Sequence, residues 1–444
     1  MSFRVVLGVG AGIAAYKSCE LLRLLTESGH RVRVVPTPDA LRFVGEATWA
    51  ALSGEPVTTD AWTGVAEVPH VRLGQSADLV LVAPATADLM GRAAAGMAGD
   101  LLTATLLTAR CPVLYAPAMH TEMWEHPATQ ANVALLRRRG AIVLDPAVGR
   151  LTGQDSGAGR LPEPAAIFAA ATRLLARGVL GPKAQDLAGR RVLVSAGGTR
   201  EEIDPVRFIG NWSTGTQGYA LARTAVVRGA EVIVVAANVA LPDPAGAKVT
   251  RVVSAREMRD AVMAAAAGAD AVVMAAAVAD YRPSGRSPAK IKKDGRPPEP
   301  IALTENPDIL AGLAAARSAR DATRSVPDNH DAERAGLIAP APVLRGGTRG
   351  SSPPESARQV LVGFAAETDT SPAAAQAKLA RKGCDLLVVN PVGNGLGFGT
   401  PDNEAVVYGS DGTVTPIPRG PKETLADVVW DLVAARLNEM GSRG

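Results

Sequence analysis

The chain has 444 residues, enough for two or three domains, and its 47 % hydrophobic and 20 % charged residues are the balance of a folded globular protein rather than a disordered one. Lysine and arginine number 47 against 44 acidic residues, so the net charge is only +3, which argues against a nucleic-acid or membrane-surface binder. The three cysteines are scattered, which excludes a disulfide scaffold. No apolar run reaches the ~20 residues of a membrane span, and no secretion signal opens the sequence. We therefore expect a cytoplasmic protein without nucleic-acid or membrane partners.

The first half of the chain alternates short apolar runs with amphipathic stretches. The apolar runs are nearly continuous, as in strands that are buried on both faces of a parallel sheet, and they occupy residues 4–8, 31–35, 78–83, 113–116 and 141–144. Residues 14–28 and 127–139 have the spacing of helices. A β-α-β alternation with short connections predicts an α/β fold with a doubly wound, mostly parallel sheet.

The second half repeats this pattern, so we predict two doubly wound domains. Its expected strands and helices are residues 191–195, 216–228, 231–236, 270–274, 360–364, 373–382 and 385–390, with a hairpin over 404–415. Glycines and a proline between 177 and 190 predict a boundary that separates a first domain of 1–180 from a second of 190–444. Residues 318–358 lack aromatic residues and apolar periodicity, so we expect a disordered surface insertion there.

A glycine-rich turn follows the first strand. Gly10 and Gly12 lie where backbone N–H groups can receive a phosphate, although a purely structural turn is the alternative. The position three residues after Gly10 is Ile13, and no acidic residue follows the second strand, so the turn is not an NAD fingerprint and suits a mononucleotide better. The loops 84–88 and 117–120 follow other strands and should lie at the same edge of the sheet.

The second half carries further glycine-rich turns and a set of lysines. Residues 195–199 and 211–218 place hydroxyl and amide side chains among glycines, which suits an anionic ligand, but they lack the ending of an NTPase P-loop. Lys378 and Lys382 are four residues apart on one helical face, and residues 290–293 form a basic loop. These lysines are either a solvated surface or the cations of a triphosphate site.

Ten stretches occur in one order along both halves: GIAAYK (12–17), PHVRLG (69–74), ADLVLVAPATADL (77–89), APAMHTEMW (116–124), GGTREEIDPVRFIGN (197–211), AAAVADYRP (275–283), KIKK (290–293), ENPDIL (305–310), VGFAAET (362–368) and ARKGCDLLVVN (380–390). In this combination the sequence resembles the bifunctional phosphopantothenoylcysteine decarboxylase/phosphopantothenate–cysteine ligase family of coenzyme A biosynthesis. The resemblance covers almost the whole chain outside 318–358.

The resemblance implies a flavodoxin-like first domain that binds FMN. The matching flavin positions are Gly12, Thr37, Ala85, Thr86 and His120. In this family the flavin oxidises the thiol of the substrate, carbon dioxide leaves, and the flavin returns the electrons to the resulting enethiol. His70 matches the family's catalytic histidine, whose expected role is to manage a proton or a charge near the thiol or the carboxylate.

The resemblance implies a Rossmann-like ligase as the second domain. CTP activates the carboxylate of 4′-phosphopantothenate as an acyl cytidylate, and the amine of cysteine displaces CMP. Lys290 matches the lysine that stabilises this step, and Asn211 matches the asparagine associated with the acyl cytidylate. The matching CTP-binding positions are Ala275, Ala276, Ala277, Asp280, Lys290, Asn306, Pro307, Asp308, Ile309, Phe364, Lys378 and Lys382. Mg²⁺ is expected to accompany CTP, held chiefly by phosphates and water, and no protein ligand is assigned to it.

The sequence departs from the family pattern in both halves. The flavin loop has Gly10 and Ala11 where a hydroxyl residue and a glycine are usual, and His120 stands where many members have asparagine. Gly153 stands where many members have a catalytic cysteine, so the final proton donor is not assigned. Thr216 stands where the ligase loop usually has a lysine.

Two alternatives to a bifunctional enzyme stay open. One is a diverged relative that keeps one activity or decarboxylates another cysteine-like thiol, and the other is a non-catalytic flavin-fold regulatory subunit. Retention of Lys290, Asn211 and Asp280 argues against the regulatory subunit. The resemblance also implies a homo-oligomer whose partners are the small molecules 4′-phosphopantothenate, cysteine and CTP.

Overall fold

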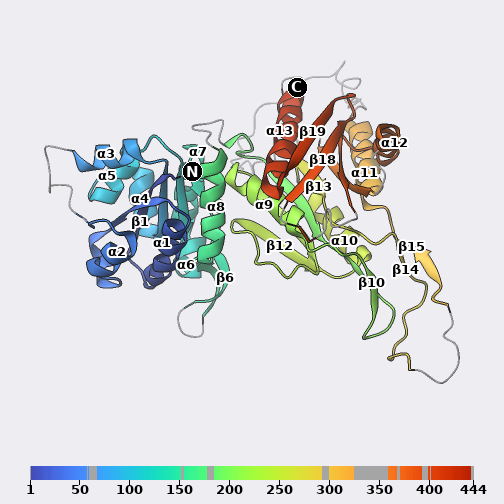
Figure 1. Ribbon diagram of the computed structural model, residues 1–444, viewed down its shortest axis with the longest axis horizontal. Helices are drawn as coiled ribbons and strands as arrows, with labels where there is room; N and C mark the ends of the chain where they lie inside the picture. The colour runs from blue at the N-terminus through green and yellow to red at the C-terminus, as the bar shows by residue number, and fades with distance from the viewer. Residues whose placement is uncertain are drawn as a thin grey trace, which may run out of the picture.

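The computed structural model describes residues 2–57, 59, 68–151, 155–177, 185–292, 300–324, 359–367, 371–392, 399–400 and 402–441. These residues form two α/β units that lie side by side, each with a central sheet and helices on both faces (Figure 1). The fold is mixed α/β with mostly parallel sheets, as the sequence predicts. None of the helices in these ranges combines the length and the apolar character that a membrane span requires.

The first unit is built on a parallel sheet with the strand order β2-β1-β3-β4-β5. Its strands are β1 (Arg4–Val9), β2 (Arg31–Pro36), β3 (Leu79–Ala85), β4 (Val113–Pro117) and β5 (Ile142–Val143). All of them lie where the apolar runs predict them, because each strand is covered by helices on both faces. The strand order reverses between β1 and β3, which is the position where ligands commonly bind at the carboxyl ends of the strands in such sheets.

Two groups of helices cover this sheet. One face packs against η1 (Ile13–Tyr16), α1 (Lys17–Glu27), η2 (Pro38–Arg42), α2 (Glu46–Ser53) and α8 (Pro164–Arg177). The other face packs against α3 (Pro69–Ser76), α4 (Ala87–Ala95), α5 (Leu101–Thr108), α6 (Thr121–Glu125) and α7 (Pro127–Arg138). An antiparallel hairpin of β6 (Ala147–Arg150) and β7 (Ser156–Arg160) contacts α6.

The second unit is built on a larger sheet with the order β12-β11-β8-β13-β16-β17-β18-β19. Its strands are β8 (Arg191–Gly197), β11 (Glu231–Ala237), β12 (Ala247–Val252), β13 (Ala271–Met274), β16 (Val360–Glu367), β17 (Leu386–Pro391), β18 (Asp402–Gly409) and β19 (Val414–Pro421). The strands from β12 to β17 are parallel and have the Rossmann order, which reverses between β8 and β13. The last two strands form the antiparallel hairpin that the sequence predicts, with Gly412 in its turn at a φ of +83°.

Helices again cover both faces of the second sheet. α9 (Thr216–Val227) and α13 (Lys422–Gly441) pack on one face, and α10 (Ala255–Ala266), α11 (Ile309–Arg324) and α12 (Pro372–Lys382) pack on the other. The predicted irregular segment is wrong for residues 318–324, which continue α11. α11 is rich in alanine, which favours a helix. The buried Arg317 also holds the helix in place, because it donates to the Gln359 carbonyl at 2.9 Å and pairs with Asp385. Residues 325–358 lie outside the described ranges.

Two small antiparallel pairs project from the second unit on the side away from the first (Figure 1). They are β9 (Arg200–Glu202) with β10 (Phe208–Gly210), and β14 (Tyr281–Pro283) with β15 (Leu303–Glu305). The pairs contact each other through β9 and β14. We call this projection the arm.

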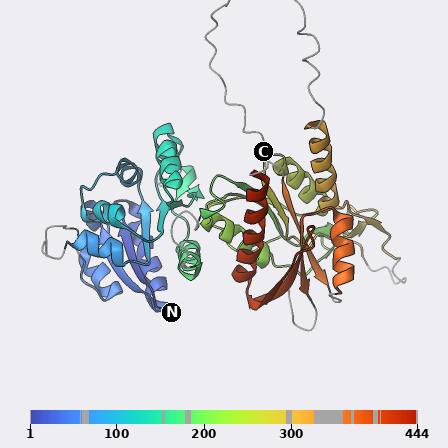
Figure 2. The ribbon, with the colours of Figure 1, turned by 90° about the horizontal axis from the view of Figure 1, so that it is seen from above.

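The two units meet where α8 packs beside α9 and α13, and they remain distinct when seen from above (Figure 2). Arg173 on α8 pairs with Asp427 on α13. Arg228, which has no exposed side-chain surface, donates to Asp186 and Asp431 at 2.8 Å each. The Arg173–Asp427 pair joins the two units, whereas the Arg228 pairs lie within the second unit beside this contact. Because these arginines are largely buried, their pairs fix geometry more than they add to stability.

Candidate functional site

Two of the predicted flavin positions, Gly12 and Thr86, follow the ends of β1 and β3. The Gly10 amide donates to the Pro84 carbonyl at 3.0 Å, and a Cβ on Gly10 would lie 2.6 Å from that oxygen. A side chain at position 10 would clash with this carbonyl oxygen. Glycine is therefore the residue that fits the close approach of the two loops. A Cβ on Gly12 would have only Thr86 near it, at 4.0 Å, so the predicted flavin positions Gly12 and Thr86 are neighbours.

The other predicted flavin positions lie at the same edge of this sheet. The Thr37 amide donates to the Val9 carbonyl at 2.9 Å, and Ala85 accepts from the Ala118 amide, two residues before His120, at 3.1 Å. Thr37 is only 5 % exposed, yet its hydroxyl has no partner among the described residues. A buried hydroxyl without a partner is costly unless a ligand satisfies it, so this edge fits a phosphate-bearing or polar ring cofactor such as FMN.

His120 begins α6 and lies beside the β6–β7 hairpin. Its Nδ1 is 3.9 Å from Glu122, and the neighbouring Met119 amide donates to the Gly159 carbonyl at 2.9 Å. Thr121 is packed against Gly157 of the hairpin, and its hydroxyl is another buried group without a partner in the described ranges. Gly153, which stands between β6 and β7 in the sequence, lies outside the described residues.

His70 lies in the first turn of α3, on the face of the sheet that α3, α4, α5, α6 and α7 cover. Its carbonyl accepts from the Thr108 hydroxyl at 2.7 Å, which ties α3 to α5. Its ring Nδ1 is buried and has no partner in the described part of the chain. None of the contacts found there joins His70 to Thr37 or Thr86, so its catalytic role remains a prediction.

The second unit has a crevice of about 630 Å³ at the edge where β8, β13 and β16 end. This is where the strand order reverses, as expected for a ligand site in a Rossmann-like sheet. The predicted residues that line it are Asn211, Ala276, Ala277, Asp280, Asn306, Pro307, Asp308, Ile309, Phe364, Lys378 and Lys382. Five separate segments of the chain therefore converge on one cavity.

Hydroxyl and amide side chains fix the walls of this crevice. The Ser195 hydroxyl accepts from the Ala276 amide at 3.1 Å, and the Thr199 hydroxyl accepts from the Ala279 amide at 2.9 Å. The Asn211 amide donates to the Ala277 carbonyl at 3.1 Å. These bonds attach the segment after β13 to β8 and to the loops that follow it. The sequence predicts that residues 195–199 suit an anionic ligand, whereas the Ser195 and Thr199 hydroxyls accept hydrogen bonds from the protein backbone.

Asn306 joins the opposite wall to the same loop. Its side-chain amide donates to the Ala279 carbonyl at 2.9 Å, and its backbone amide donates to the Asp280 carbonyl at 2.8 Å. The arm and the start of α11 are thereby held against the end of β13. The crevice consequently has a rigid backbone floor that can recognise a base or a ribose by its N–H and C=O groups.

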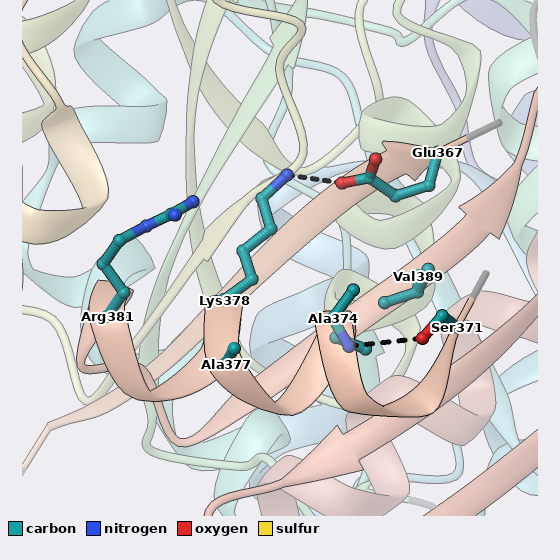
Figure 3. Close-up of a pocket in the computed structure, with 8 residues that line it drawn as sticks. Glu367, Ser371, Ala374, Ala377, Lys378, Arg381 and Val389 are labelled. Carbon is teal, nitrogen blue, oxygen red and sulfur yellow. Dashed lines mark hydrogen bonds and ion pairs between the residues drawn. The ribbon is translucent and has the colours of Figure 1, made fainter. Parts of the chain in front are cut away.

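Lys378 and Lys382 reach the crevice from α12, and each meets a carboxylate. Lys378 Nζ lies 2.6 Å from Glu367 Oε1, and Lys382 Nζ lies 2.5 Å from Asp308 Oδ2 (Figure 3 shows the first pair). Burial alone would raise the pKa of the Asp308 carboxyl, but its hydrogen bonds to Lys382 and to the α11 backbone hold that pKa below its usual range. Glu367 was not singled out from the sequence, since its partner lies 11 residues away on another element.

A smaller cavity of about 110 Å³ adjoins this crevice. It shares Ala276 and Phe364 with the larger cavity and is also lined by Ala275, by the start of α9 with Thr216, and by Lys422. The Lys422 side chain is only 4 % exposed, burial lowers the pKa of its ammonium, and it donates to the Thr400 carbonyl at 2.7 Å. A buried ammonium beside a helix N-terminus is a favourable environment for an anion.

Lys290 is the predicted residue that lies apart from the crevice. It is exposed in the arm, next to Ile291, whose carbonyl accepts from Arg207 at 2.7 Å and whose amide donates to the buried Asp204 at 3.2 Å. Arg207 precedes Asn211 by four residues along an extended segment, a separation of about 13 Å. Lys290 does not line the crevice of its own chain.

Comparison with known proteins gives a family model for each unit. Residues 1–176 match the flavoprotein family model, and residues 187–325 and 351–437 match the model of the DNA/pantothenate metabolism flavoprotein C-terminal domain. The chain is 55 % identical to the coenzyme A biosynthesis bifunctional protein CoaBC of Mycobacterium tuberculosis over 98 % of this chain and 97 % of that protein. It is 53 % identical to the protein of the same name from Mycolicibacterium smegmatis, over 98 % of each.

Among solved structures, the crystal structure of the C-terminal domain of a coenzyme A biosynthesis bifunctional protein CoaBC is 31 % identical, with a TM-score of 0.42, over 57 % of this chain and 99 % of that one. The fold and the family models define a flavoprotein domain joined to a pantothenate-metabolism domain. The chain belongs to the family of the coenzyme A biosynthesis bifunctional proteins CoaBC.

Proposed function

We propose that this protein joins 4′-phosphopantothenate to cysteine with CTP and then decarboxylates the product to 4′-phosphopantetheine with FMN. Membership of the CoaBC family over nearly the full chain supports both activities. The observation that carries the ligase half is the convergence of Asn211, Asp280, Asn306, Lys378 and Lys382 on one crevice at the switch point of the second sheet.

The ligase reaction needs positive charge, because a carboxylate must approach a phosphate that is already negative. A carboxylate oxygen of phosphopantothenate attacks the α-phosphorus of CTP, the bond to the bridging oxygen breaks, and pyrophosphate leaves with that electron pair. The amine of cysteine then attacks the acyl carbon, CMP leaves, and the amine loses a proton. Lys378 and Lys382 supply charge to the phosphates, and the Asn211 amide is a donor beside the reacting groups.

The smaller adjoining cavity suits the phosphate of 4′-phosphopantothenate. The start of α9 turns its N–H groups toward this cavity, and Lys422 lies in its wall. Thr216 offers a hydroxyl where many family members have a lysine, so Lys422 is the ammonium that we assign to this phosphate. The acyl end of the substrate would then point into the nucleotide crevice that shares Ala276 and Phe364.

Lys290 acts in the crevice of a second copy of the chain. It is exposed on an arm that projects from its own unit, whereas the reaction needs a cation beside Asn211. A homo-oligomer in which arms are exchanged supplies that cation without any rearrangement of the fold.

Mg²⁺ arrives with the nucleotide rather than in a protein cage. No group of three or more histidine, cysteine or acidic side chains able to hold a metal occurs in the part of the chain that the structure describes. The acidic residues of the crevice, Asp280 and Asp308, therefore suit contact with an ion whose remaining ligands are phosphate oxygens and water.

The flavin edge of the first unit suits the decarboxylation. Gly12, Thr37, Ala85 and Thr86 would hold FMN, with the unpartnered Thr37 hydroxyl as one of its hydrogen-bond partners. When bound, FMN supplies the two-electron oxidation and re-reduction that makes loss of carbon dioxide possible. The buried Nδ1 of His70 has no protein partner in the described ranges, and we assign to this ring the transfer of a proton at the substrate.

A coupled assay tests the proposal. Purified protein reconstituted with FMN receives 4′-phosphopantothenate, cysteine, CTP and Mg²⁺, and mass spectrometry follows phosphopantothenoylcysteine and 4′-phosphopantetheine. We expect both to form in that order. Accumulation of phosphopantothenoylcysteine alone would identify a relative that keeps only the ligase, and absence of both would favour a regulatory subunit.

A further inference from the structure

Both lysines of α12 are paired with carboxylates. Lys378 is paired with Glu367 and Lys382 with Asp308, at 2.6 Å and 2.5 Å. The Lys378 and Glu367 side chains are 30 % and 35 % exposed, so water screens their attraction and the pair is easily broken. An incoming polyphosphate must therefore compete with carboxylates for the cations that are to bind it.

The two carboxylates differ in how firmly they are held. Asp308 also accepts from the Ala311 amide at 3.1 Å, so it caps α11 whether or not Lys382 stays beside it. Lys378 is the one side chain found bound to the Glu367 carboxylate in the described ranges. A cavity of about 350 Å³ opens beside this pair, and Figure 3 shows Glu367 at its edge opposite Lys378. Glu367 can thus turn away without breaking another contact.

Lys378 lines both cavities, the one beside Glu367 and the nucleotide crevice. Its ammonium is therefore placed to change partners by a rotation of its own flexible side chain. Arg381 lies one turn further along α12, projects to the same side of the helix as Lys378 in Figure 3, and adds a third positive charge to this face. This group of charges consists of three cations and two carboxylates, so a ligand meets a net charge of +1. The members are Lys378, Arg381, Lys382, Glu367 and Asp308.

We propose that Glu367 is the resting counter-ion of Lys378 and that it weakens the binding of a nucleoside triphosphate to the ligase by competing for this lysine. A nucleoside triphosphate, with charge on its β- and γ-phosphates, takes Lys378 from Glu367. A nucleoside monophosphate lacks those phosphates and leaves the pair intact, so Lys378 returns to Glu367 once pyrophosphate has left. This exchange deepens the proposed CTP-dependent function and rests on it.

The test measures nucleotide binding to the full-length protein by titration calorimetry at fixed pH, salt and Mg²⁺. Glu367→Gln keeps the shape of the side chain and removes its charge, so the Kd for CTP should fall by about two- to fivefold, the range that an exposed ion pair supports. The Kd for CMP should stay unchanged. Lys378→Gln should weaken CTP binding, and in that background Glu367→Gln should have no further effect.

A matched control is Glu231→Gln at the opposite edge of the same sheet. Glu231 also pairs with a lysine, Lys248, at 3.3 Å, but it lies away from both cavities, so its variant should bind CTP as the wild type does. If Glu367→Gln weakens CTP binding as Lys378→Gln does, the carboxylate merely orients the lysine and the inference is wrong. The inference is also wrong if CMP tightens as much as CTP, or if the effect persists without Lys378. Failure of the wild type to bind CTP would instead overturn the proposed function itself.

Discussion

Lys290 provides the sharpest prediction, because it lies on the exposed arm and not in the crevice of its own chain. Lys290→Ala removes the cation, and Asn211→Asp adds a negative charge where an amide lines the crevice. Each variant alone should have less than about 1 % of the wild-type ligase activity, since loss of one stabilising donor at a developing charge costs on the order of a hundredfold or more. Flavin binding should be intact in both, because the first unit is unchanged.

Mixed oligomers show whether the arm acts on a neighbouring chain. If each crevice combines Asn211 of one chain with Lys290 of another, random pairing of the two inactive variants makes half of the dimers mixed, and one crevice of each mixed dimer is complete. Co-expressed variants should therefore recover about a quarter of the wild-type activity, measured as pyrophosphate release. Lys292→Ala in the same loop is the control and should remain active. No recovery above the single variants would refute exchange of the arm.

Three further predictions address other parts of the account. His70→Asn should stop decarboxylation of purified phosphopantothenoylcysteine and leave ligation unchanged; equal loss of both would show a folding defect instead. Gly10→Ser should lower the FMN content seen in the visible spectrum, because its Cβ would lie 2.6 Å from a backbone carbonyl, whereas Gly12→Ser has only a 4.0 Å contact and should fold normally. Asn306→Ala should raise the KM for CTP by about fivefold with little change in kcat. Its side chain donates to the Ala279 carbonyl in the crevice wall, a bond worth ~1 kcal/mol, and accepts from Arg282 in the arm. Asn238→Ala is the control, because the Asn238 side-chain amide donates to the Gly198 and Val253 carbonyls but lies outside the crevice. This variant should lower the melting temperature and leave the KM for CTP unchanged.

The strands and the order of the elements follow closely from the sequence. Runs such as 4–8 and 191–195 are apolar at every position except their ends, a pattern that only strands covered on both faces need. The irregular segment was misjudged at its start because residues 318–324 contain arginine and serine, which are compatible with an exposed helix as well as with a loop. The buried contacts of Arg317 with Asp385 and Gln359 continue the helix, and sequence spacing does not reveal such partners.

The candidate sites were predicted in part. The residues that line the crevice of the second unit were named from motif resemblance, and the structure brings them together because the loops after parallel strands meet at one edge. Their binding of CTP stays a prediction. The partners of its lysines were not, since Asp308 and Lys382 are 74 residues apart and only the packing of α11 beside α12 brings them together. The absence of Lys290 from the crevice lining was likewise not predictable, because it depends on how the connection between β14 and β15 folds.

The central claim is that the second unit activates a carboxylic acid by attack on CTP, and an isotope measurement tests it directly. 4′-Phosphopantothenate labelled with heavy oxygen in its carboxylate is incubated with the protein, CTP, Mg²⁺ and cysteine, and the CMP formed is analysed by mass spectrometry. An acyl cytidylate transfers one labelled oxygen to each CMP, and this is the result we predict. Unlabelled CMP, with ligated product formed, would contradict the account.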